Sequence, residues 1–411
     1  MSRLLRTCFA AAFIAGLIGA SSPGRAAAPA GPAASAPAPG TSPADLDRLV
    51  SGAMAQYRLK AILVQVSSQG RTTYLRARGE SMAGVAAAPA MHFRNGAFAF
   101  TYMSTLLMEL VDRHVVSLDE KLAKFLPDLP DAGKISLKNL ADMTSGYADY
   151  VYQPEVLGGT TRDPFRHWTS QELIRIGTGT PMLFAPGSNW AYSHTNYVIL
   201  GRVLELATHM KLADALRQYV LQPMHLTDTK GFDTPVIPEP VLHAFSSERR
   251  ADLGIPAAKP FYEESTYWNP SWTTAEGAVE TTSIADLVRT MIDVGTGRLL
   301  SKASFAAQVG PNLVGFGHSQ PGCAACRANT TAFNYGLGVL NLGPWVTQTK
   351  SFAGSAASAG YLASHGLAIA VVTTNGAGAY DAKGDAVDAS GPIFASIANL
   401  MAPDARIAMP K

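Results

Sequence analysis

The apolar stretch between Phe93 and Pro127 constrains the fold of this chain more than any other feature of its sequence. From Phe98 to Val111 the residues are apolar on nearly every side of a helix, and Glu109 is the one charged residue among them. A helix that is apolar all round is buried on every side, and this one is too short to span a bilayer. The sequence therefore predicts a central helix enclosed by the other elements of a globular domain.

The folded region is expected to begin with a helix and a β-hairpin. Ser42 fits the N-cap position, and Pro43 fits the first helical position, where its missing N–H loses no hydrogen bond. Two runs of strand-forming residues follow at 61–67 and 72–78, and Gly70 lies in the turn between them.

The C-terminal end mirrors this arrangement. The run 367–374 is typical of a strand, and a last helix follows it with an apolar face expected at Ile393, Ile397 and Leu400. We expect strands from the two chain ends to pair in one antiparallel sheet flanked by the terminal helices. The segment between them, residues 97–292, is expected to form a mostly helical lobe, which gives a two-lobed α+β fold.

The first residues have the layout of a secretory signal peptide. Arg3 and Arg6 precede an apolar run at 8–20, and small residues follow at 24–28. This pattern predicts a leader over residues 1–26 that is removed on export. The mature protein is therefore expected in the periplasm or the medium.

The rest of the composition indicates a short tether and one domain. Residues 27–43 are almost entirely Ala, Pro, Gly and Ser, which predicts a disordered tether, and residues 44–403 are expected to form a single domain. Hydrophobic residues make up 47% of the chain and its formal net charge is +2, without a basic stripe. We expect a large core, no nucleic-acid partner and no membrane span after leader removal. The oligomeric state stays open.

The cysteines suggest a disulfide. Cys8 would leave with the leader, so Cys323 and Cys326 remain of the three cysteines. Together with His318 they offer three candidate metal ligands, but a fourth ligand is not nearby in the sequence. In an oxidising compartment a local disulfide is the favoured interpretation. We expect no metal and no other cofactor.

Several phrases of the sequence occur in the order of a known family. F-R-N-G-A-F-A-F spans 93–100, and S-L-D-E-K-L-A-K-F-L-P spans 117–127. L-A-D-M-T-S-G follows at 140–146, and F-A-P-G at 184–187 leads into Y-S-H-T-N-Y at 192–197. These phrases resemble the serine β-lactamase and penicillin-binding-protein superfamily, in particular its class C-like branch of β-lactamase-related esterases and D-amino-acid peptidases. The resemblance implies a β-lactamase/transpeptidase-like fold.

The same resemblance implies that two catalytic side chains are missing. In this family acyl transfer uses a serine at a helix N-terminus and a lysine one turn later, where the two share a helix face. The serine position falls on Ala97 and the lysine position on Phe100. No register shift restores the pair, because the sequence has no lysine between Lys60 and Lys121.

The walls of the expected cleft are partly retained. The family's tyrosine is kept as Tyr192, and His194 stands where the family has asparagine or serine. A strand motif, lysine or histidine followed by x-Gly, falls on residues 352–354, so that Phe352 replaces the cation and Gly354 is kept beside the ligand. We expect Phe352 to meet Phe100 across the cleft. Tyr192, His194 and Gly354 are the candidate binding residues.

These changes favour a pseudoenzyme of the cell envelope that binds a small-molecule or peptidoglycan-like ligand, or a partner, without hydrolysing it. The alternative is an active hydrolase of esters, β-lactams or D-amino-acid peptides through displaced groups, with His194 and Tyr192 as an acid/base pair. A third hypothesis is a structural envelope component whose cleft is plugged.

Overall fold

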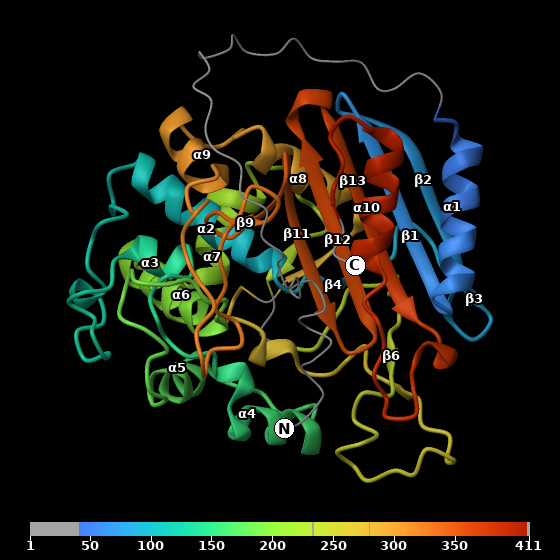
Figure 1. Cartoon of the computed structure of the whole chain (residues 1–411), viewed down its shortest axis with the longest axis horizontal. Coiled ribbons are helices and arrows are strands. Elements are labelled where there is room, and N and C mark those ends of the chain that lie inside the picture. The colour runs from blue at the N-terminus through green and yellow to red at the C-terminus, as the bar shows by residue number, and fades with distance from the viewer. Residues whose placement is uncertain (1–40, 232–233, 279, 409–411) are drawn as a thin grey trace.

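An eight-stranded antiparallel sheet organises the computed structural model, which describes residues 41–231, 234–278 and 280–408 (Figure 1). The expected leader, residues 1–26, and most of the expected tether lie outside the described residues. In spatial order the strands are β3 (Val85–Ala86), β2 (Arg71–Met82), β1 (Leu59–Ser68), β13 (Leu367–Asn375), β12 (Ser355–Leu362), β11 (Trp345–Phe352), β10 (Leu340–Leu342) and β9 (Asn334–Tyr335).

The two chain ends pair at the middle of this sheet, as predicted. Strand β1 is antiparallel to β13, with Val64 opposite Val371, and it forms the expected hairpin with β2. The turn between β1 and β2 uses Gln69 and Gly70, both with positive φ. Residues far apart in the sequence therefore build one continuous sheet, and the rest of the chain is inserted between its halves.

Helix α1 (Pro43–Gln56) begins where the sequence indicated. The Ser42 side chain accepts a hydrogen bond from the backbone N–H of Asp45, and the Asp45 carboxylate accepts one from the backbone N–H of Ser42, which completes a capping box. Pro43 belongs to this helix and not to the tether. Leu46 and Val50 are buried against the sheet.

Helix α10 (Ser390–Met401) covers the same face of the sheet next to α1 (Figure 1). Ile393 and Ile397 are buried as predicted, but Leu400 is wrong as a member of that face, because 37% of it is exposed. Phe394 and Met401 are buried instead.

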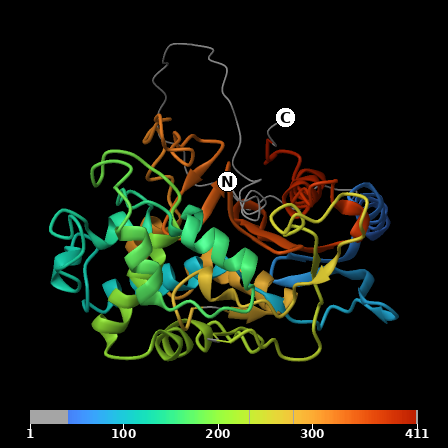
Figure 2. The same cartoon turned by 90° about the horizontal axis from the view of Figure 1, so that it is seen from below.

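The opposite face of the sheet packs on α8 (Ile284–Gly295), beside which the helical lobe lies (Figure 2). The other α-helices are α2 (Phe98–Asp112), α3 (Leu137–Ala141), α4 (Pro154–Arg162), α5 (Ser170–Thr178), α6 (His194–Thr208), α7 (Leu212–Leu216) and α9 (Lys302–Val309). The short 3₁₀ segments are η2 (Leu122–Lys124), η3 (Tyr150–Tyr152), η5 (Pro270–Trp272), η6 (Ala363–His365) and η7 (Ala377–Ala379), and η4 (Arg217–Leu221) is a π-helical segment after α7. Two small sheets join β4 (Phe93–Arg94), β8 (Glu280–Thr282) and β5 (Lys230–Gly231), and β6 (Phe245–Ser246) with β7 (Glu263–Glu264). In the ranges described, no helix combines the length and the apolar character needed to cross a membrane.

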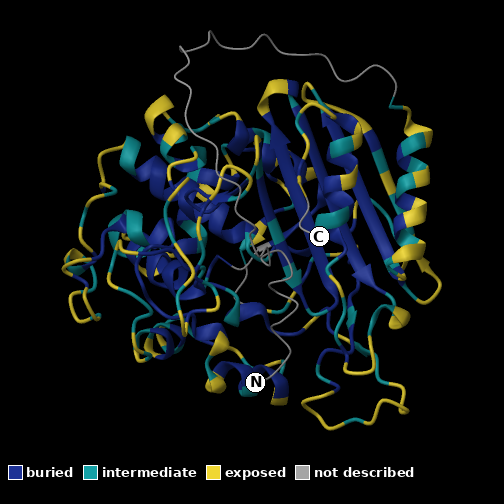
Figure 3. Cartoon of the chain, in the orientation of Figure 1, coloured by how far each residue is buried: buried dark blue, intermediate teal, exposed yellow. Residues whose placement is uncertain are grey.

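Helix α2 is the predicted central helix. Every residue from Phe98 to Leu110 is buried, including Glu109, which pairs with Arg113 at the helix end. The Thr101 hydroxyl donates to the backbone oxygen of Gly338, so the helix is tied directly to the segment before β10. Figure 3 shows the buried interior running from this helix through the central strands. The α+β fold expected from the sequence is confirmed.

Candidate functional site

The floor of the site is the N-terminus of α2. Ala97 occupies the N-cap position and offers only a methyl group, so its side chain caps no backbone N–H. Gly96 and Ala97 are both partly exposed, whereas the helix behind them is buried. Residue 97 is thus accessible where the sequence placed the family's nucleophile, but it has no nucleophilic atom.

A lysine that sequence reasoning missed lies beside this floor. Lys350 of β11 is 3% exposed, and its Nζ donates a hydrogen bond to the Ser355 hydroxyl. A Cβ at Gly96 would lie 2.7 Å from the Lys350 Cβ, so only glycine, here at φ +60°, allows this approach.

This lysine means that β11 still carries a positive charge near the floor of the site. The assignment of the family's cation position to Phe352 stays a prediction, and the same strand carries a buried lysine two residues earlier, whose Cβ lies next to Gly96. Alternate residues of a strand face the same side, so Lys350 and Phe352 share one face of β11. The two-residue period of a strand was therefore the sequence signal that could have identified Lys350 as a neighbour of Phe352.

Phe100 forms the aromatic wall above the floor. Its ring stacks on Tyr197 with centroids 4.2 Å apart, and it contacts the rings of His194 at 5.6 Å and Tyr192 at 6.0 Å. Phe100 is 1% exposed. The position to which the resemblance assigns an amine is therefore filled by a ring that is packed on all sides.

The expected contact between Phe100 and Phe352 is wrong. Phe352 belongs to a separate apolar cluster with Trp268, and its ring stacks on Trp272 at 5.9 Å. The two phenylalanines therefore line different parts of the molecule, and the hypothesis that they jointly plug the cleft is not supported.

His194 and Tyr192 lie together at the start of α6. Their rings meet edge to face at 5.2 Å, and Tyr192 is partly exposed. His194 Nδ1 lies 2.9 Å from Oδ2 of Asp149, a residue that the sequence analysis did not single out. Asp149 is 45 residues away in the chain, so no local pattern connects the two.

Gly354 does not leave room for a ligand in the way expected. It has φ +83°, and a Cβ there would lie 2.0 Å from the backbone oxygen of Phe245, so the chain itself fills that space. The Gly354 N–H donates to Glu248 Oε1 at 3.0 Å. Loss of hydration in this buried position raises the pKa of Glu248 to about 7.

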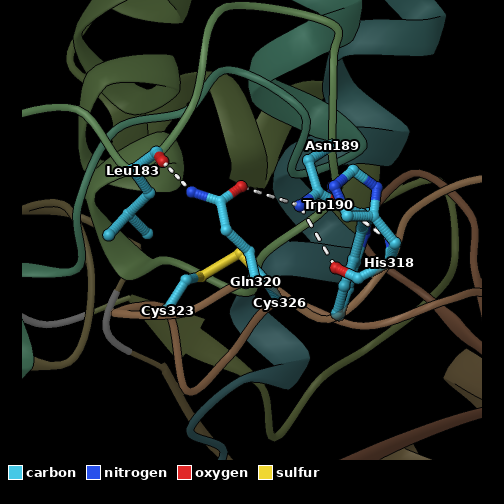
Figure 4. The surroundings of a disulfide bond; sticks show 7 residues. All are labelled: Leu183, Asn189, Trp190, His318, Gln320, Cys323 and Cys326. Atoms are coloured by element: carbon cyan, nitrogen blue, oxygen red, sulfur yellow. Dashed lines mark hydrogen bonds between the residues drawn. A yellow bond between two sulfur atoms is a disulfide. The ribbon is translucent and has the colours of Figure 1, made fainter.

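The predicted disulfide between Cys323 and Cys326 is confirmed (Figure 4). The backbone N–H of His318 donates to Asn189 Oδ1 at 2.9 Å, and the His318 backbone oxygen accepts a hydrogen bond from Asn189 Nδ2 at 3.1 Å. Cys326 also pairs with Ala191 in an antiparallel bridge. The disulfide loop therefore braces the segment that leads into Tyr192. Within the described ranges, no three His, Cys, Asp or Glu side chains gather in a way that could hold a metal ion.

Comparison with known proteins agrees with this architecture. The family described as Beta-lactamase matches residues 46–391. Esterase EstB of Burkholderia gladioli is 28% identical over 45% of this chain and 50% of its own length, and penicillin-binding protein 4* of Bacillus subtilis is 26% identical over 35% and 31%. The chain thus spans half or less of the length of these curated relatives.

Solved structures show the same fold over nearly their full length. A D-stereospecific amidohydrolase from Streptomyces sp. superposes with a TM-score of 0.69 at 21% identity, covering 87% of this chain and 98% of its own. The D-amino acid amidase of Ochrobactrum anthropi SV3, complexed with L-phenylalanine, gives 0.69 at 20% identity, covering 87% and 99%.

Proposed function

The chain belongs to the beta-lactamase family of serine hydrolase folds, and we propose that it is a pseudoenzyme of this family, which binds its ligand without forming an acyl-enzyme. One observation carries the proposal: residue 97 is alanine and residue 100 is a phenylalanine stacked on Tyr197. Alanine has no lone pair with which to attack, and a phenyl ring cannot accept its proton.

Ligand binding is supported over a purely structural role by the polar groups that remain. Lys350 is buried beside Gly96, and the Asp149–His194 pair adjoins Tyr192. Burying a cation and a carboxylate costs free energy, and a cleft that served only for packing would be expected to replace both with apolar residues.

The ligand class is proposed from the relatives. Those with solved structures include a D-stereospecific amidohydrolase and a D-amino acid amidase, and a curated relative is a penicillin-binding protein. We propose small D-amino-acid amides or peptidoglycan-like peptides as ligands. The leader expected over residues 1–26 and the disulfide support a periplasmic or secreted location.

Two measurements test the proposal. Intact-mass spectrometry after incubation with a penicillin or a fluorophosphonate should show no added mass. Titration calorimetry should detect binding of D-phenylalanine amide, and the amide should not be hydrolysed. An adduct mapped to a side chain of the cleft would overturn the proposal and place the alternative, a hydrolase acting through displaced groups, first.

A further inference from the structure

We infer that Asp149 and His194 form a recognition pair in the cleft, in which Asp149 orients the imidazole so that His194 Nε2 accepts a hydrogen bond from an amide N–H of the bound molecule. The inference rests on the proposed function, because it identifies the group that would hold a ligand in the absence of acylation.

The hydrogen bonds of Asp149 define the state of the imidazole. Asp149 Oδ2 lies 2.9 Å from His194 Nδ1, and Oδ1 accepts the backbone N–H of Val151 at 3.0 Å. An ionised carboxylate only accepts hydrogen bonds, so this contact favours the tautomer with the proton on Nδ1, in which the lone pair of the ring lies at Nε2.

The fold holds this pair in place. The Thr195 hydroxyl donates to the backbone oxygen of Ala148 at 2.6 Å and accepts the backbone N–H of Tyr150 at 3.2 Å. The residues on both sides of Asp149 are thus attached to the first turn of α6, which carries His194. Asp149 is 5% exposed and His194 9%.

The other ring nitrogen is open. His194 Nε2 has no hydrogen-bond partner in the described part of the chain, and solvent can reach this atom. The side chain keeps 11% of its surface exposed. Phe100 and Tyr192 flank the ring, so a group that reaches Nε2 enters an aromatic setting where water competes weakly.

Two buried hydroxyl groups close to the pair leave hydrogen bonds for a bound polar molecule or for water. Ser193 Oγ and Tyr150 Oη are buried, and neither has a hydrogen-bond partner among the described residues. The Tyr150 ring centroid lies 6.1 Å from that of His194. Native proteins rarely leave buried hydroxyls unsatisfied, and a bound polar molecule or ordered water is the usual partner.

This chemistry selects hydrogen-bond donors. A lone pair backed by a carboxylate attracts an amide N–H and disfavours a carboxylate oxygen at the same place. D-phenylalanine amide and its N,N-dimethylamide form a suitable pair of probes, because only the first has amide N–H groups.

Calorimetry with these two probes tests the inference. The wild-type protein should bind the primary amide roughly tenfold more tightly than the dimethylamide. Asp149→Asn keeps an oxygen for the Val151 N–H but turns an NH₂ donor toward Nδ1, so Nε2 becomes a donor and the preference should disappear. An unchanged melting temperature would show that the Asp149→Asn variant is folded. If it is not folded, His194→Gln serves as the second variant. Equal affinity of the wild type for both amides would overturn the inference.

Carbethoxylation by diethyl pyrocarbonate gives a test without a ligand. The reagent acylates an accessible neutral imidazole nitrogen, so His194 should be modified in the native protein. His114, which is exposed, is the reactive control. His365 is the unreactive control, because its Nδ1 lies 2.9 Å from Ser364 Oγ and its Nε2 3.2 Å from Asp404.

The possible outcomes separate the two proposals. An unmodified His194 in a protein whose His114 reacts would overturn the inference. Failure of both amides to bind would remove this ligand class from the proposed function, and the carbethoxylation result would then decide the inference alone. Turnover or a covalent adduct would overturn the proposal of a pseudoenzyme but not the inference that His194 Nε2 accepts a hydrogen bond from the ligand.

Discussion

At the scale of single residues, the proposed pseudoenzyme rests on positions 97 and 100. Ala97→Ser alone should not be labelled by a fluorescent penicillin, because Phe100 stands where its base would be and catalytic groups that act as a unit recover little singly. The double variant with Phe100→Lys should be the first to label, because it restores both the hydroxyl and the amine that the family reaction uses.

The double variant should also be less stable. It replaces a ring stacked on Tyr197 with an ammonium group in a buried site, at a cost on the order of 3 kcal/mol in the free energy of unfolding. Denaturant titration measures this loss, and gel fluorescence measures labelling. Labelling of the single Ala97→Ser variant would contradict the argument.

Glu248 gives a prediction on pH. Its pKa is raised from 4.5 to about 7 by burial, with the Asp385 charge adding to the effect. Between these values the folded state binds more protons than the unfolded state, so stability falls as pH rises from about 4.5 and levels off above about 7. The loss should be roughly 3 kcal/mol.

Glu248→Gln should remove this part of the pH dependence. Glutamine keeps an oxygen for the Gly354 N–H and cannot ionise. The melting temperature of the variant should therefore exceed that of the wild type at pH 8 but not at pH 4. Glu155→Gln, at an exposed helix position, is the matched control. Parallel pH profiles for wild type and Glu248→Gln would refute the prediction.

At the scale of elements, the disulfide loop should stabilise the segment that carries Tyr192. Replacing both Cys323 and Cys326 with serine removes a short closed loop, which is worth about 2 kcal/mol in chain entropy. The melting temperature should fall by a few degrees, and reduction of the wild type should reproduce the shift. If reduced and oxidised protein melt alike, the loop contributes nothing to this segment.

Local sequence patterns predicted a helix well where nearby residues alone determine it. The capping residues Ser42 and Pro43 fixed the start of α1, and continuous apolarity identified α2. At Leu400 the pattern failed, because the buried side of α10 follows Ile393, Ile397 and Met401, a four-residue spacing that leaves Leu400 on the solvent side.

The site was predictable only in part. Ala97, Phe100, Tyr192 and His194 lie in contiguous family phrases, whereas Asp149 contributes through a contact that depends on how the loop before η3 folds against α6. Gly354 shows the same limit, since nothing local indicates that the Phe245 backbone covers it.

At the scale of the whole molecule, the core on the outer face of the sheet is assembled from both chain ends. Leu46 of α1, Val371 of β13 and Ile397 of α10 belong to one apolar cluster. Neither end can bury its apolar face alone, so the sheet and both terminal helices should form together.

Truncation after Asp388, which removes α10, should therefore abolish folding. It would expose the apolar faces of β12 and β13 along with Val50 of α1, a loss far larger than the 5–15 kcal/mol that stabilises typical proteins. Circular dichroism and calorimetry should show no cooperative transition. A chain that begins at Thr41 is the control: it keeps the Ser42 capping box and should melt like the longer protein. A truncated chain that still melted cooperatively would show that the sheet and the lobe fold without α10.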